Sequence, residues 1–117
     1  MKYFLFLDDS QERHDKFDAI CKDLDVEVIH VFTAMEAIRA LKMFRIFDCA
    51  FLDHDLEDTD LEDTGFVVAG FIALHCNPAY VPKNVVIHSW NPEGADAMKK
   101  VLTNFSSINV TVVPFKA

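Results

Sequence analysis

Acidic residues directly follow two short apolar segments of the chain. Asp8 and Asp9 come after "FLFL", and Asp53, His54 and Asp55 come around the end of "AFL". Carboxylate oxygens are hard ligands of the kind that Mg²⁺ and Mn²⁺ prefer, and these ions keep positions for water and phosphate oxygens. The residue types therefore predict that Asp8, Asp9 and Asp53 hold Mg²⁺ or Mn²⁺, beside which a small phosphate-bearing ligand binds.

Two histidines are candidate site residues, one beside these acids and one directly after the next apolar segment. His54 follows Asp53 directly, and His88 opens the stretch "HSWNPEG". Each alone reads as a loop or strand-end residue, but as a pair from neighbouring strands they favour acid and base catalysis, with Asp55 orienting one ring. The remaining histidines have no such company and are assigned structural roles: His14, His30 and His75. The candidate ligand contacts are Ser89, Asn91 and Arg13.

The stretch from Phe51 to Gly65 holds seven acidic residues and no basic one. Within it, "DLEDT" occurs twice in tandem, at Asp55–Thr59 and Asp60–Thr64, which suggests a small duplication that lengthened a loop. A calcium-binding helix-loop-helix is disfavoured, because the spacing lacks the turn glycine and the closing glutamate. We assign only the first three acidic-loop residues to the site and expect Glu57–Asp63 to be a hydrated loop.

Five short apolar segments rich in Val, Ile and Phe are predicted to be buried strands. They are Tyr3–Leu7, Val26–Phe32, Cys49–Leu52, Val85–Ile87 and Ile108–Val113. Segments with helical spacing separate them, so strands and helices alternate along the whole chain. Such alternation predicts a single (βα)5-type domain over residues 1–117, with a parallel sheet of flavodoxin-like order 2-1-3-4-5 and helices on both faces. Ligands bind such sheets at the carboxyl ends of the strands, where the acids lie.

The helix starts carry recognisable signals. A helix follows Ser10, a capping box occupies Thr33–Glu36, and Asn91 with Pro92 predicts the start of the last helix. A third helix is expected from Thr64 and Gly65. The predicted inward-facing residues are Phe17, Ile20, Cys21 and Leu24 in the first helix, Ala37, Ile38 and Leu41 in the second, Phe66, Ala69, Ile72 and Ala73 in the third, and Met98, Val101, Leu102 and Phe105 in the fourth.

Composition limits the classes of function. The 117 residues are 51% hydrophobic, enough for one domain with a core of its own, and the net charge of −8 argues against binding long nucleic acid. Three widely spaced cysteines fit reduced thiols better than a disulfide framework. No segment reads as a signal sequence or a membrane span, so we expect a cytoplasmic protein with no membrane contact. The oligomeric state is left open.

The residues resemble those of response-regulator receiver domains. "FLDD", Asp53 and Ser89 stand where receivers hold Mg²⁺, accept a phosphoryl group and end the fourth strand. Receivers also carry a lysine before a proline at the end of the fifth strand, whereas "VVPF" places Val113 there, and neither Lys83 nor Lys116 matches it. This difference predicts that Asp53 forms no stable acyl phosphate.

Three further motifs resemble a receiver-derived group, the cyclic-phosphate processing receiver domains. They are "LDHDL" at Leu52–Leu56, "TGF" at Thr64–Phe66 and "HSWNPEG" at His88–Gly94. The resemblance implies metal-dependent hydrolysis of a small cyclic phosphate, such as a cyclic nucleotide or a 2′,3′-cyclic phosphate end. Two alternatives stay open: a non-catalytic nucleotide-binding module, and a degenerate receiver phosphorylated on Asp53.

Overall fold

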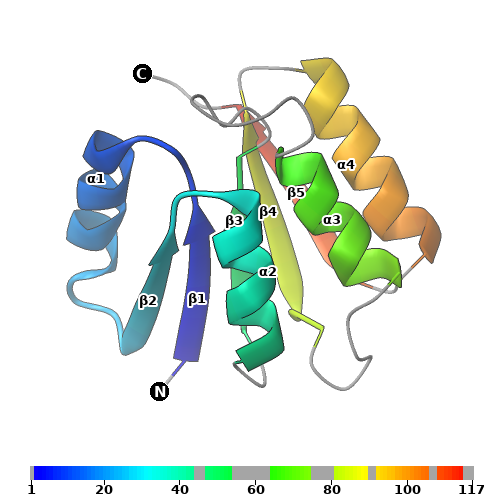
Figure 1. The fold of residues 1–117 in the computed structure, drawn as a ribbon. Coiled ribbons are helices and arrows are strands. Elements are labelled where there is room, and N and C mark those ends of the chain that lie inside the picture. The colour runs from blue at the N-terminus through cyan, green and yellow to red at the C-terminus, as the bar shows by residue number, and fades with distance from the viewer. Residues whose placement is uncertain are drawn as a thin grey trace.

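Five strands and four helices alternate in the computed structural model, which describes residues 2–43, 47–53, 64–74, 81–89, 92–105 and 108–114 (Figure 1). The strands are β1 (Lys2–Leu7), β2 (Val26–Val31), β3 (Cys49–Leu52), β4 (Asn84–Ser89) and β5 (Asn109–Pro114). The helices are α1 (Gln11–Cys21), α2 (Ala34–Met43), α3 (Gly65–Leu74) and α4 (Pro92–Phe105). The predicted order of elements is confirmed, and the predicted strand boundaries agree with the structure to within two residues.

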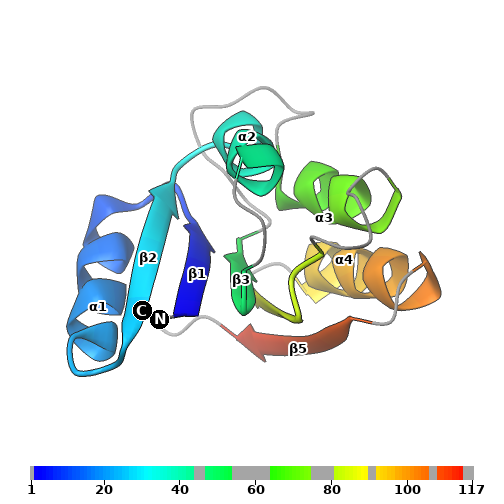
Figure 2. The same ribbon diagram turned by 90° about the horizontal axis from the view of Figure 1, so that it is seen from below.

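The strands form one parallel sheet in the order β2-β1-β3-β4-β5, as the alternation predicted. α1 lies on one side of the sheet, outside β2, and α2, α3 and α4 lie on the other (Figure 2). β2 and β5 are the two edge strands of this sheet. The central strands β1, β3 and β4 therefore bring their carboxyl ends to one rim.

The sheet face toward α2, α3 and α4 is packed with aliphatic side chains. Leu5, Ala50 and Val85 lie side by side in the strand register and are fully buried. They belong to one apolar cluster with helix residues such as Val68 and Met98. Because the strands are buried on both faces, they read as continuous apolar segments in the sequence.

The opposite sheet face, toward α1, is packed with aromatic rings. Phe17 of α1 stacks on Phe6 of β1 with ring centroids 4.2 Å apart, and its ring lies 4.7 Å from that of Phe51 in β3. Phe4 meets Phe51 edge to face at 5.3 Å. This aromatic layer fixes α1, and with it the turn between β1 and α1, against the centre of the sheet.

The helix starts follow the predicted signals where the structure describes them. Thr33 and Glu36 form the reciprocal capping box, since the Glu36 N–H donates to Thr33 Oγ1 and the Thr33 N–H donates to Glu36 Oε1, both at 3.1 Å. Ser10 is the N-cap of α1, and its Oγ accepts from the Arg13 N–H. Pro92 begins α4, whereas Asn91 lies outside the described residues.

Three predicted core positions are wrong. Ile20 is 73% exposed, Leu24 is 53% exposed and Phe66 is 39% exposed. α1 ends at Cys21, so Leu24 is not helical, and the helix turns His14 and Cys21 inward instead of Ile20. In α3 nearly every residue is apolar, so the sequence offers no polar side from which to orient the helix, and Phe66 falls on the outside.

None of the described helices combines the length and the apolar character needed to cross a membrane.

Candidate functional site

The carboxyl ends of the three central strands bring the predicted acids and one histidine together. Asp8 follows β1, Asp53 follows β3, and His88 is the fifth residue of β4. Backbone bonds continue past the strand ends, because the Asp53 N–H donates to the Leu7 carbonyl at 3.1 Å. The sheet itself therefore fixes the positions of these residues.

Three carboxylates form a compact cluster at this rim. One oxygen each from Asp8, Asp9 and Asp53 lies within 4.8 Å of the others. Asp8 is fully buried and Asp53 is 5% exposed, while Asp9 is partly exposed. Buried carboxylates at this spacing repel one another strongly unless a cation lies among them.

Arg13 supplies one positive charge to the cluster. Its Nε and Nη2 donate to the two carboxylate oxygens of Asp8, each at 2.7 Å, and Nη2 also lies 3.1 Å from Asp9 and 3.6 Å from Asp53. The hydrogen bond to Asp8 is the main cause that raises the pKa of Arg13 above its ordinary value. The Ser10 cap starts α1 so that Arg13 reaches back over the strand ends.

The chemistry of the donor set fits a divalent cation. Three carboxylates and one guanidinium give −3 + 1 = −2 at the rim, which the charge of one Mg²⁺ or Mn²⁺ would balance. All the candidate ligand atoms are hard oxygens, as these ions prefer. Asp8, Asp9 and Asp53 are therefore the residues that could hold a metal.

His88 lies at the buried inner side of the cluster. Its ring is 6% exposed, stacks parallel to Phe6 with centroids 5.1 Å apart, and places Nδ1 3.5 Å from Asp8 Oδ2. Burial lowers the pKa of His88 to about 4, despite the opposing effect of the Asp8 charge. The ring is accordingly neutral near pH 7, so it can accept a proton there but is not an imidazolium acid.

A second histidine lies on the backbone side of Asp8. His14 is 1% exposed, its Nε2 donates to the Asp8 carbonyl at 2.8 Å, and its Nδ1 meets Nδ1 of His30. His30 Nε2 lies 2.8 Å from Asp18 Oδ1. Burial is the main cause that lowers the pKa of His14. Both histidines were expected to have structural roles, but 16 positions separate them, so nothing in the sequence indicated that they touch.

Several predicted site residues are not described by the structure. His54, Asp55 and Asn91 lie outside the described residues, as does His75, and for Ser89 only the backbone at the end of β4 is described. The roles assigned to these residues stay predictions. The residues brought together are Asp8, Asp9, Arg13, Asp53 and His88.

The position that carries lysine in receivers is described, and it lies near the site. Val113 of β5 pairs in register with His88 of β4 and is 44% exposed. No charged side chain therefore stands at this register position. Among the described residues, the positive charge beside the carboxylates therefore comes from Arg13 on α1 and not from β5.

Similar solved structures are receiver domains. A response regulator from Burkholderia pseudomallei, with a phosphorylated aspartic acid, calcium ion and citrate, has a TM-score of 0.74 and 13% identity over 100% of this chain and 61% of that one. The response regulator TrrA from Thermotoga maritima, in complex with Mg²⁺ and BeF, has a TM-score of 0.69 and 16% identity over 99% and 90%.

A third structure is the receiver domain of a sensor histidine kinase from Pseudomonas aeruginosa, with magnesium coordinated in its active-site cleft. It has a TM-score of 0.69 and 19% identity, and the alignment covers 98% of this chain and 87% of that one. Identities this low establish the fold alone. No curated protein matches the chain.

The sequence carries a more specific relationship than these structures do. The family model of the cyclic-phosphate processing receiver domain matches residues 3–104, which spans every element from β1 through nearly all of α4. The matched region includes the carboxylate cluster, Arg13 and His88. With its receiver fold and its acids at the ends of β1 and β3, the chain belongs to the cyclic-phosphate processing receiver domain family.

Proposed function

We propose that this receiver-type domain binds Mg²⁺ or Mn²⁺ through Asp8, Asp9 and Asp53 and uses the metal-loaded rim to bind and hydrolyse a small cyclic phosphate. The observation that supports it is the cluster of three carboxylates within 4.8 Å, two of them buried. A cation there, when bound, would offset the negative charge of a phosphoryl group and polarise it. The cyclic phosphate is a cyclic nucleotide or a 2′,3′-cyclic end in this proposal.

The residues around the carboxylates have separate roles in the proposal. Arg13 lies at the partly exposed mouth of the cluster, where its guanidinium donates hydrogen bonds to a phosphate oxygen. His88 is neutral and next to Asp8, so it accepts a proton from water during hydrolysis, and Asp8 stabilises the resulting imidazolium. His54, outside the described residues, is assigned to protonating the leaving oxygen, with Asp55 orienting a histidine.

The second candidate function is phosphorylation of Asp53 in the manner of a response regulator. The receiver fold and the structural neighbour with a phosphorylated aspartic acid favour it. Val113 argues against it, because the charge of a phosphorylated Asp53 would have no lysine beside it on β5. A non-catalytic nucleotide-binding module is the third possibility, with the same cation and rim.

Metal binding is tested first, since every candidate function requires it. Calorimetric titration of the full chain with Mn²⁺ and with Mg²⁺ is expected to show one site. Asp53→Asn should weaken Mn²⁺ binding by at least about tenfold, because a ligand oxygen is lost. Asp18→Asn, which removes a carboxylate outside the cluster, is the matched control and should bind as the parent does. Equal affinity in all three proteins would contradict the proposal.

The three functions are separated by product analysis. The metal-loaded chain is incubated with a panel of 3′,5′-cyclic nucleotides and 2′,3′-cyclic phosphates and, separately, with a small phosphodonor. Hydrolysis that disappears in Asp53→Asn supports the proposal. Tight binding of one panel member without turnover supports the binding module. A mass increase of one phosphate that Asp53→Asn abolishes supports the receiver alternative and overturns the predicted absence of an acyl phosphate.

A further inference from the structure

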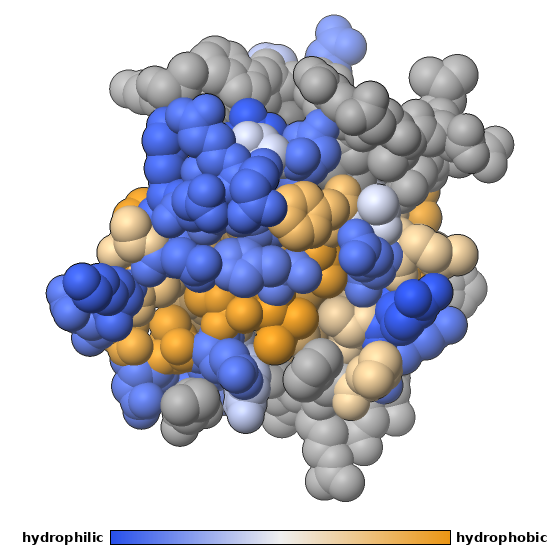
Figure 3. Space-filling model, turned by 60° about the vertical axis from the view of Figure 1, so that its left-hand side comes forward, coloured by the Kyte–Doolittle hydropathy of each residue, from blue (hydrophilic) through white to orange (hydrophobic). Residues whose placement is uncertain are grey.

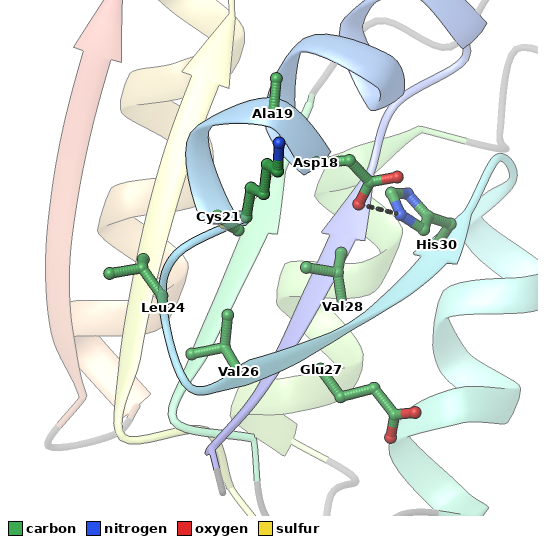
Figure 4. Close-up of a pocket in the computed structure, with 9 residues that line it drawn as sticks. Asp18, Ala19, Cys21, Leu24, Val26, Glu27, Val28 and His30 are labelled. Atoms are coloured by element: carbon green, nitrogen blue, oxygen red, sulfur yellow. Dashed lines mark hydrogen bonds and ion pairs between the residues drawn. The ribbon is translucent and has the colours of Figure 1, made fainter.

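A groove lies between α1 and the outer edge of β2, away from the carboxylate cluster. It has a volume of about 660 Å³, and its walls come from the C-terminal half of α1, the turn to β2, and β2 itself. In Figure 4, Leu24, Val26 and Val28 lie along one end and the middle, while the Asp18–His30 pair closes the other end. The volume suits several side chains of a bound peptide.

The groove follows a strand edge whose backbone groups point outward. The Asp8 N–H donates to the Val31 carbonyl, so the odd-numbered residues of β2 direct their backbone groups toward β1. In a ladder of this kind the intervening residues direct theirs the other way. Val26, Val28 and His30 therefore present N–H and C=O groups at the outer edge, where none of the described strands pairs with them.

The side chains at this edge alternate in a way that a strand could match. Val26, Val28 and His30 line the groove on the α1 side of the sheet, in register with β1 residues of the aromatic face. Glu27, on the other face of β2, also lines it, so the groove wraps around the strand edge. Figure 3 shows apolar surface on this side of the molecule, between hydrophilic groups.

The groove and its flanking residues are acidic. Its lining includes Asp18 and Glu27 against Lys22. The adjoining sequence adds Asp15, Asp23 and Asp25 against Lys16, so that residues 15–27 hold an excess of three acids. Every one of these acids is exposed. Two copies of the chain joined edge to edge here would bring two such acidic segments together, so charge complementarity favours a basic partner over a second copy.

We propose that the α1–β2 groove binds an extended, basic segment of a partner polypeptide, which adds to the sheet as a sixth strand beside β2. The backbone of the segment bonds to Val26, Val28 and His30. Its apolar side chains, at every second position, enter the groove against α1, and the intervening Lys or Arg side chains lie on the Glu27 face. Main-chain bonds supply affinity and the alternating side chains supply specificity in this mode of recognition.

The test uses two synthetic peptides as probes, acetyl-KVKVKVK-amide and its acidic counterpart acetyl-EVEVEVE-amide. Each is titrated into the isotope-labelled full chain, and backbone amides are followed by NMR and by hydrogen exchange. The basic peptide is expected to shift and protect the amides of Val26, Val28 and His30, with a dissociation constant below about 1 mM. The acidic peptide should bind at least about tenfold more weakly, because of the rim charge.

Two substitutions locate the contact. Val28→Pro removes one outward N–H without removing a bond to β1, since proline is tolerated on edge strands, and should weaken binding of the basic peptide at least about tenfold. Val28→Thr keeps the N–H and the side-chain shape, and should bind as the parent does. Glu27→Lys, at an exposed position, lowers the acidic excess of residues 15–27 from three to one and should reduce the preference for the basic peptide, and it keeps the test decisive if Val28→Pro does not fold.

The proposal is overturned by any of four results. These are no binding of the basic peptide at millimolar concentration, perturbed amides outside β2 and α1, unchanged binding in Val28→Pro and Glu27→Lys, or concentration-dependent self-association that protects the β2 amides. The last result would assign the groove to a second copy of the chain. None of these readouts involves the metal site, so the outcome is independent of the proposed function.

Discussion

His14 and His88 are both buried histidines in contact with Phe6, and both approach Asp8, but they approach different parts of it. His14 donates to the backbone carbonyl of Asp8 at 2.8 Å, whereas His88 lies 3.5 Å from the carboxylate. Burial lowers the pKa of both rings. Both ring nitrogens of His14 form contacts that hold the turn after β1. The ring of His88 instead faces the Asp8 carboxylate, whose negative charge can stabilise a proton bound to the ring.

Burial and a lowered pKa do not by themselves mark a catalytic histidine. His14 meets a neutral carbonyl and a second ring, so a substrate has no place beside it. His88 lies on the strand that ends at the rim, next to a candidate metal ligand. The group that each ring faces, and not its depth, supports a structural role for His14 and the proposed catalytic role for His88.

The largest expected effect is on turnover. His88→Ala should lower the rate of cyclic phosphate hydrolysis by about 10²- to 10⁴-fold, the usual contribution of a positioned proton acceptor, while Mn²⁺ affinity largely persists. His54→Ala should act similarly. Initial rates and Mn²⁺ titrations of the same preparations measure both quantities. If the domain only binds nucleotides, the substitutions lower ligand affinity alone.

A His54→Ala, His88→Ala double variant that keeps the parent rate would break the assignment of either histidine to proton transfer. His30→Ala is the matched control, because it alters the histidine pair behind Asp8 without touching the carboxylates. It should leave turnover within about threefold of the parent value if the comparison holds.

The next effect is on folding stability. His14→Ala removes a fully buried ring that stacks on Phe32 at 4.0 Å and leaves the Asp8 carbonyl without its donor. Loss of packing and of this hydrogen bond should lower the free energy of unfolding by about 3 kcal/mol. Urea denaturation measures it. His88→Phe keeps a flat ring against Phe6 and should change stability by less than about 1.5 kcal/mol.

Equal destabilisation by His14→Ala and His88→Phe would remove the contrast between a structural and a functional ring. If His14→Ala instead loses more Mn²⁺ affinity than His88→Phe, the contrast between the two rings is strengthened. Such a result would show that His14 positions the Asp8 backbone for metal binding.

The free energy of unfolding should also decrease as the pH is lowered, because His88 titrates differently in the folded and unfolded chain. The pKa of His88 is lowered to about 4 by burial, and unfolding returns it to its ordinary value near 6.5. The unfolded chain therefore binds a proton that the folded chain excludes, so stability is highest above about pH 6.5 and declines as the pH falls to about 4. The expected loss is about 3 kcal/mol, and His14, shifted in the same direction, adds to it.

Urea denaturation at a series of pH values, with a chelator present to exclude metal ions, gives this slope. His88→Phe removes one titrating ring and should make the profile between about pH 6.5 and 4 less steep, while the contribution of His14 remains. A His88→Phe profile that matches the parent would mean that other groups cause the acid sensitivity.

The strand pattern and the positions of the acids were predictable, since both depend on local sequence. The alternation of apolar strands with helical segments predicted the parallel sheet and its order, and parallel strands bring their ends together, so Asp8, Asp9 and Asp53 were expected to meet. Arg13 was expected to touch the ligand. Its pair of hydrogen bonds to the Asp8 carboxylate was not expected, because it depends on where α1 begins, and the sequence does not place that start to within a residue.

Contacts between distant segments were not predictable. The meeting of His14 with His30 depends on how α1 crosses β2, and that crossing follows from the stacking of Phe17 on Phe6. The exposed Ile20 has the same cause, because the aromatic layer selects which side of α1 turns inward. A single sequence carries no direct information on tertiary packing, so neither the contact between the two histidines nor the exposure of Ile20 could be predicted from it.

The smallest expected effect concerns the outer end of the histidine contacts. His30 Nε2 lies 2.8 Å from Asp18 Oδ1, and His30 in turn contacts His14, which donates to the Asp8 carbonyl. In Asp18→Asn the side-chain amide can still hydrogen-bond to His30. Because Asp18 and His30 are partly exposed, the free energy of unfolding should change by less than about 1 kcal/mol, as measured by urea denaturation. A loss as large as that of His14→Ala would show that Asp18, and not only the buried ring of His14, holds the turn after β1.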